Sequence, residues 1–174
     1  MHLRKRLKEK LTNSLSADGL RKVYSAFDII GDIAIIKTSL LNLEEAKTTA
    51  NQILTIHKNI KAVYTQSGAI KSGYRNRELK LLGGEEKTIA SHKESGCIFE
   101  VDIAKCYFSP RLSHERARIA YLVQGGEVVV NMFAGVGCFS IMIANTVPQV
   151  KVYSIDVNPT AVEFMVKNVR MNRV

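Results

Sequence analysis

The sequence predicts an α/β protein in two parts: a small α+β domain over residues 1–104, and the first part of a parallel βαβ domain over residues 105–174. In the second part, apolar strands alternate with helices in the order "EVVVNMF", "CFSIMIANTV", "KVYSIDV" and "NPTAVEFMVKNVRMN". This order is typical of a parallel sheet with helical crossovers. The first part has short strands separated by turns at Gly84 and Gly96, which indicates a sheet rich in hairpins.

The elements of the first part follow from local patterns. "LRKRLKEKLTNSL" places leucines at helical spacing with basic residues between them, which predicts a short amphipathic basic helix. A strand follows the turn at Gly31, and "NLEEAKTTANQILTIHKNI" is then a helix with Asn42 as its N-cap. "KAVYTQSG", "KTIASHKE" and "CIFEVDIA" are expected to be strands.

The elements of the second part begin with the helix "SPRLSHERARIAYLVQGG", which ends at its two glycines. "EVVVNMF" is expected to be a buried strand, and the glycine turn "AGVG" leads from it into the next helix. Asn158 and Pro159 are expected to start the last helix as its cap and its first residue.

Charge and cysteine content restrict the class of protein. The chain has 25 basic and 16 acidic residues, a net charge of +9 and a pI near 9.6. This balance favours a polyanionic partner over a small-molecule substrate alone, although a solvated basic surface is the alternative. Cys97, Cys106 and Cys138 form no CxxC pair. They predict neither disulfides nor a zinc site, and they suit a reducing, cytoplasmic location.

The most apolar window of the chain, residues 128–144, is the only stretch that resembles a membrane span. It is slightly short for a span, and it contains Asn131 and two glycines. We therefore expect no membrane partner.

The glycine turn predicts a nucleoside site. An apolar strand leads into Gly135 and Gly137, and Asp156 follows Gly137 by 19 positions at the end of the next strand. Glycines allow a ligand to approach the backbone closely, and an acid at this distance accepts hydrogen bonds from ribose hydroxyls. Ser140 stands at the third glycine position of a dinucleotide motif, and Phe133 crowds the turn, which argues against a pyrophosphate ligand. A tight turn without a ligand is the alternative.

These residues resemble a known family. "FAGVGCFSI" and "IDVNPTAVE" resemble the S-adenosylmethionine-binding motifs of Rossmann-like class I methyltransferases. "FDIIGDIAII", "YRNREL", "TIASHKESGCIFEVDIAKCYFSPRLSHERARIA" and "FAGVG", in this order, resemble the archaeal and eukaryotic tRNA (guanine37-N1) methyltransferases. Related wybutosine-pathway enzymes share part of this pattern. The resemblance covers about residues 24–174; Asn131 replaces the usual Asp, and Cys138 replaces a common Pro.

The resemblance implies methyl transfer from S-adenosylmethionine to N1 of guanosine 37 in the anticodon loop of tRNA. It assigns three catalytic positions: Glu115 as general base, Arg75 as the cation facing O6, and Tyr107 beside the extruded base. It places Arg116 near the methionine carboxylate of the cofactor. The other residues that it implies around S-adenosylmethionine are Phe133, Gly135, Gly137, Asp156 and Val157.

Each role has a structural alternative. Glu115 is at ion-pairing distance along a helix from Arg111 and Arg118. Arg75 would otherwise be a surface residue of a basic loop, and Tyr107, Phe133 and Val157 would otherwise be core residues. His92 and His114 have no metal-ligand spacing, so we expect surface or loop histidines and no metal.

Two other functions remain open. One is a wybutosine-pathway enzyme that uses the same cofactor, and the other is an RNA-binding fragment without activity. The resemblance implies an Asn-x-Pro loop and further strands beyond residue 174. We therefore expect residues 1–174 to be a truncated piece that binds cofactor poorly, transfers no methyl group and associates through its exposed sheet.

Overall fold

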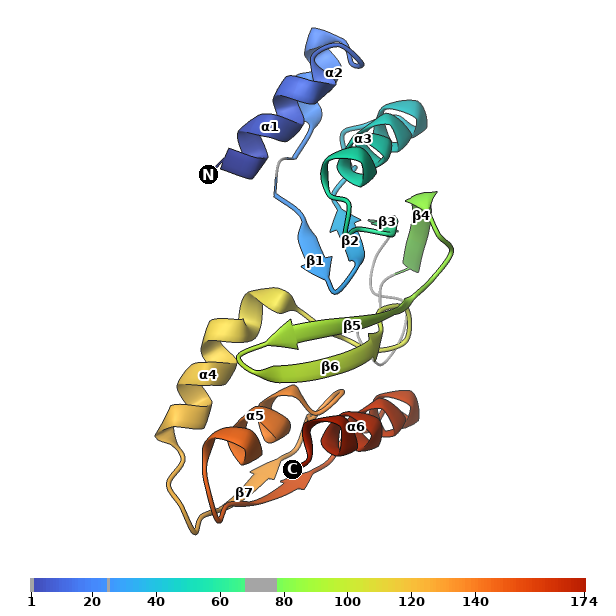
Figure 1. Cartoon of the computed structure of the whole chain (residues 1–174). Helices are drawn as coiled ribbons and strands as arrows, with labels where there is room; N and C mark the ends of the chain where they lie inside the picture. The colour runs from blue at the N-terminus through green and yellow to red at the C-terminus, as the bar shows by residue number, and fades with distance from the viewer. Residues whose placement is uncertain (1, 25, 68–77) are drawn as a thin grey trace. The chain divides into compact units, whose positions relative to one another are not determined.

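The computed structural model describes residues 2–24, 26–67 and 78–174 (Figure 1). The chain divides into two compact units. The first unit consists of the described residues up to Lys87, and the second consists of Thr88–Val174. The expected boundary near residue 104 is therefore displaced toward the N-terminus.

The first unit contains a mixed sheet. Its elements are α1 (His2–Leu11), α2 (Ala17–Lys22), β1 (Asp28–Ile30), β2 (Ile33–Ile36), α3 (Leu43–Ile56), β3 (Ala62–Ser67) and β4 (Glu78–Gly84). The strand order is β1-β2-β3-β4. β1–β2 and β3–β4 pair antiparallel, whereas β2 and β3 pair parallel and are joined by α3. The sequence indicated a sheet rich in hairpins. The structure has two antiparallel pairs and one parallel pair, so this prediction is confirmed only in part.

Helix α3 covers this sheet and begins where the sequence predicts. The Asn42 side chain accepts a hydrogen bond from the Glu45 amide, and the Glu45 carboxylate accepts one from the Asn42 amide, which completes a capping box. The buried face of α3 packs into the core of this unit. That core also includes Leu7, Leu11, Val23, Ala34, Ile36, Ile60, Val63 and Leu82.

Strand β4 was not expected, because its two glycines indicated a turn. Gly83 and Gly84 instead pair with Val63 and Ala62 beside a register shift. Gly84 has φ +87°, and a Cβ there would lie 2.1 Å from the Lys61 carbonyl oxygen. The glycine allows this close approach of two backbones at the end of the strand.

The second unit contains a hairpin and a βαβ unit. Its elements are β5 (Ile89–Glu94), β6 (Cys97–Asp102), the 3₁₀ turn η1 (Pro110–Leu112), α4 (Ser113–Leu122), β7 (Val128–Asn131), α5 (Cys138–Thr146), β8 (Lys151–Ser154) and α6 (Pro159–Asn172). β5 and β6 pair antiparallel, and β7 and β8 pair parallel across the α5 connection. Asn158 caps α6, as predicted, by accepting a hydrogen bond from the Thr160 amide.

Two asparagines of α6 bind the outer edge of β6. The Asn168 amide group accepts a hydrogen bond from the Glu100 N–H and donates one to the Glu100 carbonyl. Asn172, one helical turn later, makes the same two bonds with Ile98. The helix thus satisfies the backbone groups that a neighbouring strand would otherwise bind. For this reason the β5–β6 hairpin belongs to the second unit.

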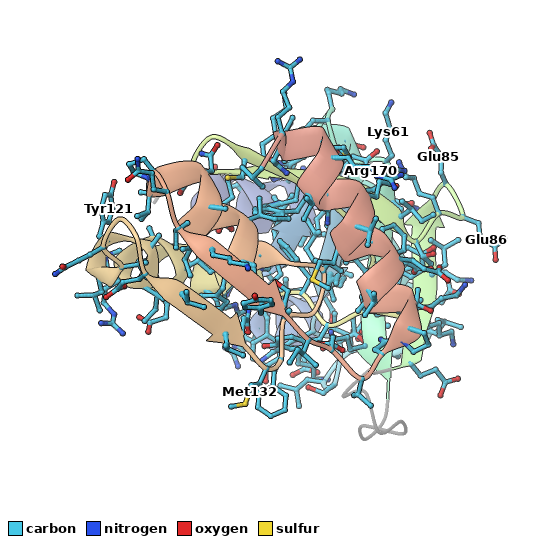
Figure 2. The ribbon with its side chains drawn as sticks, turned by 90° about the horizontal axis from the view of Figure 1, so that it is seen from below. Lys61, Glu85, Glu86, Tyr121, Met132 and Arg170 are labelled. Atoms are coloured by element: carbon cyan, nitrogen blue, oxygen red, sulfur yellow. The ribbon has the colours of Figure 1, made fainter. Side chains whose placement is uncertain are left out.

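Among the described residues, side chains cover one face of the β7–β8 sheet, so β7 is half-buried and not the buried strand that we expected. Val129 and Val152 pack toward Met142 and Ile143 of α5. On the other face Val130 is 56% exposed. Figure 2 shows Met132, just after β7, projecting outward at the edge of this unit. Within the described ranges, no helix has the length and apolarity needed to cross a bilayer.

Candidate active site

The candidate site lies where β7 and β8 end. Asp156, just after β8, accepts a hydrogen bond from the Gly135 amide at 2.6 Å through Oδ2. Its Oδ1 accepts one from the Asn158 amide at 2.9 Å. The carboxylate therefore joins the glycine turn to the start of α6. The structure brings together these two features, which lie 21 positions apart in the sequence.

The two glycines of the turn have different roles. Both have positive φ, +55° at Gly135 and +91° at Gly137. A Cβ at Gly137 would lie 2.9 Å from side-chain atoms of Ile141 and Met165, so this glycine allows close packing below the turn. At Gly135 the nearest atom would be the Tyr107 carbonyl oxygen at 4.0 Å. The turn is therefore open at Gly135, on the side where a ligand would approach.

Ser140 forms a polar bridge below the turn. Its hydroxyl accepts a hydrogen bond from the Asn131 side-chain amide at 3.0 Å and one from the Ser154 hydroxyl at 2.7 Å. Ser140 is only 5% exposed. The residue at the third glycine position thus links the ends of β7 and β8, where a dinucleotide motif would have no side chain.

Three predicted site residues surround the turn and are not core residues. Phe133 and Val157, after β7 and β8, are 86% and 78% exposed, and Tyr107 is 58% exposed. The segment that carries Tyr107 is attached to the site, because the Asn158 side-chain amide donates to the Lys105 carbonyl at 2.8 Å. The apolar and aromatic side chains around the turn are thus available to a ligand.

Glu115 forms the ion pair that was the alternative to its catalytic role. Arg118 donates to both carboxylate oxygens, at 2.8 Å from Nε and 2.7 Å from Nη2. The hydrogen bond from Arg118, followed by the charge of Arg118, holds the pKa of Glu115 below its ordinary value. The pair is exposed, so water and ions screen it. Glu115 is therefore ionised, and a substrate can compete for its carboxylate.

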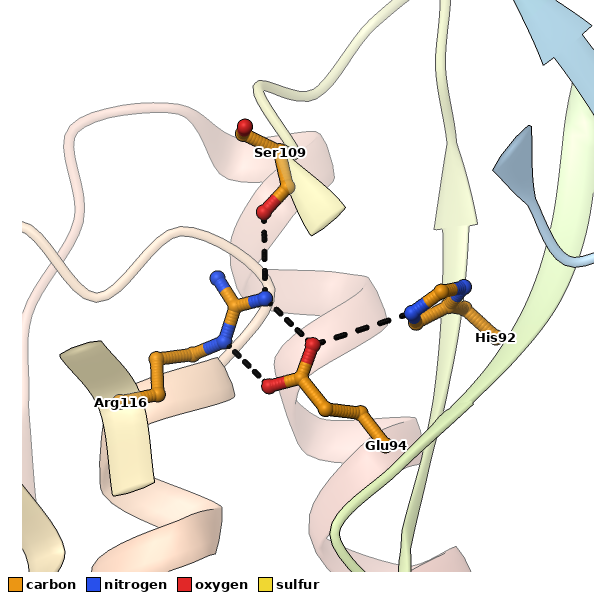
Figure 3. A network of polar contacts seen from close by, with 4 residues as sticks. All are labelled: His92, Glu94, Ser109 and Arg116. Carbon is orange, nitrogen blue, oxygen red and sulfur yellow. Dashed lines mark hydrogen bonds and ion pairs between the residues drawn. The ribbon is translucent and has the colours of Figure 1, made fainter. Parts of the chain in front are cut away.

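Arg116 is buried in a second ion pair, which Figure 3 shows. Its Nε and Nη2 donate to the two carboxylate oxygens of Glu94 at 2.6 Å and 2.5 Å, and Nη2 also donates to the Ser109 carbonyl at 3.1 Å. The residue is 2% exposed. The structure therefore does not support contact between Arg116 and a cofactor carboxylate, because Glu94 already occupies the face of the guanidinium that would make it.

The sequence did not identify Glu94 as a site residue, and it misplaced His92. The His92 side chain is 16% exposed, with Nε2 3.7 Å from a Glu94 oxygen, so it is not a surface or loop histidine. Burial lowers the pKa of His92 more than the neighbouring Glu94 raises it. The alternation of "KTIASHKE" was the available signal, because it places Ala90, His92 and Glu94 on one face of β5.

The remaining groups to place are Arg75 and the cysteines. Arg75 lies outside the described residues. Burial raises the pKa of the Cys106 thiol to about 11 and that of Cys138 to about 12, so neither is a thiolate near neutral pH. In the part of the chain that the structure describes, no three His, Cys, Asp or Glu side chains form a possible metal site.

Comparison with known proteins finds a family match in each part of the chain. Residues 90–174 match the family described as "TRM5/TYW2 methyltransferase domain", and residues 7–88 match "TYW2 N-terminal domain". The tRNA (guanine(37)-N(1))-methyltransferase Trm5b of Pyrococcus abyssi is 44% identical over 150 residues, which cover 86% of this chain and 45% of the relative. The chain thus spans about half the length of the curated relatives it matches.

Two solved structures agree with this result. The complex of aTrm5 with tRNALeu has a TM-score of 0.80 and 36% identity, and the match covers 97% of this chain and 48% of that one. The structure of Pyrococcus horikoshii TYW2 in complex with MeSAdo has a TM-score of 0.75 and 29% identity, and it covers 98% of this chain and 60% of that one.

Proposed function

We propose that the chain acts in methyl transfer from S-adenosylmethionine to N1 of guanosine 37 in the anticodon loop of a tRNA, because its two parts match the TRM5/TYW2 methyltransferase domain and the TYW2 N-terminal domain and it is similar to a tRNA (guanine(37)-N(1))-methyltransferase. One observation carries the proposal at the level of residues. The glycine turn is fixed to Asp156 and open at Gly135, next to the backbone of Tyr107. This is the arrangement that a nucleoside ligand and a neighbouring base require.

The cofactor side of the site consists of Phe133, Gly135, Gly137, Asp156 and Val157. The open space at Gly135 and the exposed apolar side chains fit an adenosine group, which needs apolar contact and few polar anchors. Asp156 accepts hydrogen bonds from the ribose hydroxyls, because its two bonds from backbone N–H groups leave further lone pairs on the carboxylate. When bound, S-adenosylmethionine supplies the methyl group. Arg116 is not assigned to the cofactor, because its guanidinium binds Glu94.

We assign Glu115, Tyr107 and Arg75 to the base side of the site, and Arg75 lies outside the described residues. N1 of guanine carries a proton at neutral pH, and the Glu115 carboxylate accepts it after releasing Arg118. Negative charge then grows on O6, where Arg75 provides a charge-assisted hydrogen bond. Tyr107 packs against the extruded base with its exposed ring.

The partner is a tRNA, and the basic balance of the chain supports this. Its net charge of +9 favours binding to phosphates, with an affinity that falls as salt rises. The three cysteines are buried and free, which suits the reducing cytoplasm.

The decisive experiment is the mass of the product on a transcript that carries guanosine 37. The protein at its natural length is incubated with labelled S-adenosylmethionine, and the modified nucleoside is identified by mass spectrometry. We expect a gain of one methyl group at N1. A larger transferred group, or methylation only of a pre-modified guanosine, would assign the chain to the wybutosine pathway, to which the TYW2 likeness also points. Cofactor binding without turnover would indicate an RNA-binding role.

A further inference from the structure

We propose that Glu94 is a positioning residue of this site. It fixes the guanidinium of Arg116, and through Arg116 it holds the backbone at Ser109. The segment that carries Tyr107 and the first turn of α4, which carries Glu115, thereby keep one arrangement. This role rests on the function proposed above.

The ion pair between Glu94 and Arg116 is buried, so stabilisation of the fold alone does not account for it. The Glu94 and Arg116 side chains are 4% and 3% exposed. The loss of hydration on burying two charges often exceeds their attraction, so two apolar side chains of similar volume generally stabilise a fold as well or better. What apolar side chains do not provide is direction. A guanidinium bound at two nitrogens to one carboxylate has a fixed orientation.

The fixed guanidinium contacts two successive residues of the segment between β6 and α4. Nη2 donates to the Ser109 carbonyl, and the guanidinium carbon lies 5.3 Å from the centre of the Phe108 ring. His92 contacts the other side of this arrangement, with its ring edge-to-face with Phe108 at 5.1 Å. Tyr107 precedes Phe108 directly, so its backbone position follows from these contacts.

The same segment has no side-chain cap at the start of either helical element. No side chain caps η1 at Ser109, and none caps α4 at Leu112. Helix N-termini are commonly fixed by such caps. A cap would accept a hydrogen bond from a helix N–H, whereas Arg116 donates one to the Ser109 carbonyl, so the Arg116 bond fixes the segment from the side without replacing a cap. Arg116 also follows Glu115 directly, so its orientation sets that of the first turn of α4.

The test separates position from stability with three variants of the protein at its natural length. Glu94→Gln leaves the Arg116 charge buried without its partner, and we expect a clear drop in the thermal midpoint. The double variant Glu94→Leu/Arg116→Met removes both charges, and we expect a midpoint near that of the wild type. Lys167→Met is the matched control, because it removes an exposed ion pair with Glu100 in the same unit; it should change nothing.

Activity and exchange then report position. In the double variant we expect the single-turnover rate of methyl transfer to fall by about 10- to 100-fold, the cost of misplacing groups by roughly 1 Å. The dissociation constants for S-adenosylmethionine and tRNA should stay within about threefold, since neither residue contacts them on this view. Amide hydrogen exchange over residues 106–112 should become faster, with no change in β5 and β6.

The outcomes are distinguishable from those of the proposed function. If the wild type transfers no methyl group, the proposed function fails, and hydrogen exchange in the double variant still decides whether Glu94 orders the segment. A double variant with wild-type rate and exchange would overturn the positioning role. A double variant that unfolds would also overturn it, because the pair would then be required for the fold itself.

Discussion

Replacing Asn168 should destabilise the second unit more than any other single asparagine change on α6. Its side chain is fully buried and makes three hydrogen bonds: with the Glu100 N–H at 2.8 Å, the Glu100 carbonyl at 3.0 Å and the Val136 carbonyl at 2.9 Å. Asn168→Ala leaves all three backbone groups without this partner. A buried polar group left unsatisfied costs about 1–3 kcal/mol. Because the Glu100 groups are only partly buried, we expect a total of about 3–5 kcal/mol, a large share of the stability of a domain.

Asn172→Ala is the matched control. Asn172 makes the same pair of bonds, with Ile98 in place of Glu100, but its side chain is only partly buried. Water can replace its bonds, so we expect a loss of about 1 kcal/mol. Urea unfolding, followed by circular dichroism, measures the free energy of unfolding of both variants. The two values are comparable if both unfold with the same dependence on urea concentration (the m-value). If Asn168→Ala costs no more than Asn172→Ala, the buried edge of β6 does not depend on the asparagine.

Three further outcomes follow from the site. Arg118→Gln should raise the pKa of Glu115 toward its ordinary value, because Arg118 stabilises the ionised form; a carboxyl ¹³C titration that shows no change would refute this. His92 has a lowered pKa in the fold, so the unfolded chain binds more protons at this residue than the folded chain does. The contribution of His92 to stability should therefore be full above its unfolded pKa and should be lost as pH falls through its folded pKa. In urea unfolding at several pH values, His92→Gln should remove this dependence. Asp156→Ala should weaken S-adenosylmethionine binding by about 1–3 kcal/mol, and calorimetry that finds an unchanged affinity would remove Asp156 from the site.

Local signals predicted much of the fold. Asn42 and Asn158 cap the helices that they were expected to cap, because the bonds of a cap span only two or three residues. The βαβ unit follows from apolar runs separated by the glycine turn. Strand β4 was missed because Gly83 and Gly84 signal a turn locally. In the fold they allow a close approach to another strand, which no local pattern records.

The candidate site was predicted less completely, for the same reason. The glycine turn and Asp156 were linked through the 19-residue spacing from Gly137, and the structure joins Asp156 directly to Gly135 of the same turn. No comparable spacing in the sequence identifies the ion-pair partner of Arg116. Glu94 lies 22 residues earlier on a different element, and the sequence offers several other acids to the same arginine. Only the fold, which brings the Glu94 carboxylate to the Arg116 guanidinium, selects between them.

The hydrogen bonds between α6 and β6 also determine when this part of the protein can complete its folding. Asn168 and Asn172 reach strand residues that are 68 and 74 positions earlier in the chain. During synthesis, the hairpin leaves the ribosome well before the helix that satisfies its outer edge. Contacts of such long sequence separation form slowly, because a large loop must close first. Until α6 has been synthesised, the backbone N–H and C=O groups at the outer edge of β6 have no hydrogen-bond partner from the helix. During this interval the edge can pair with a strand of another chain.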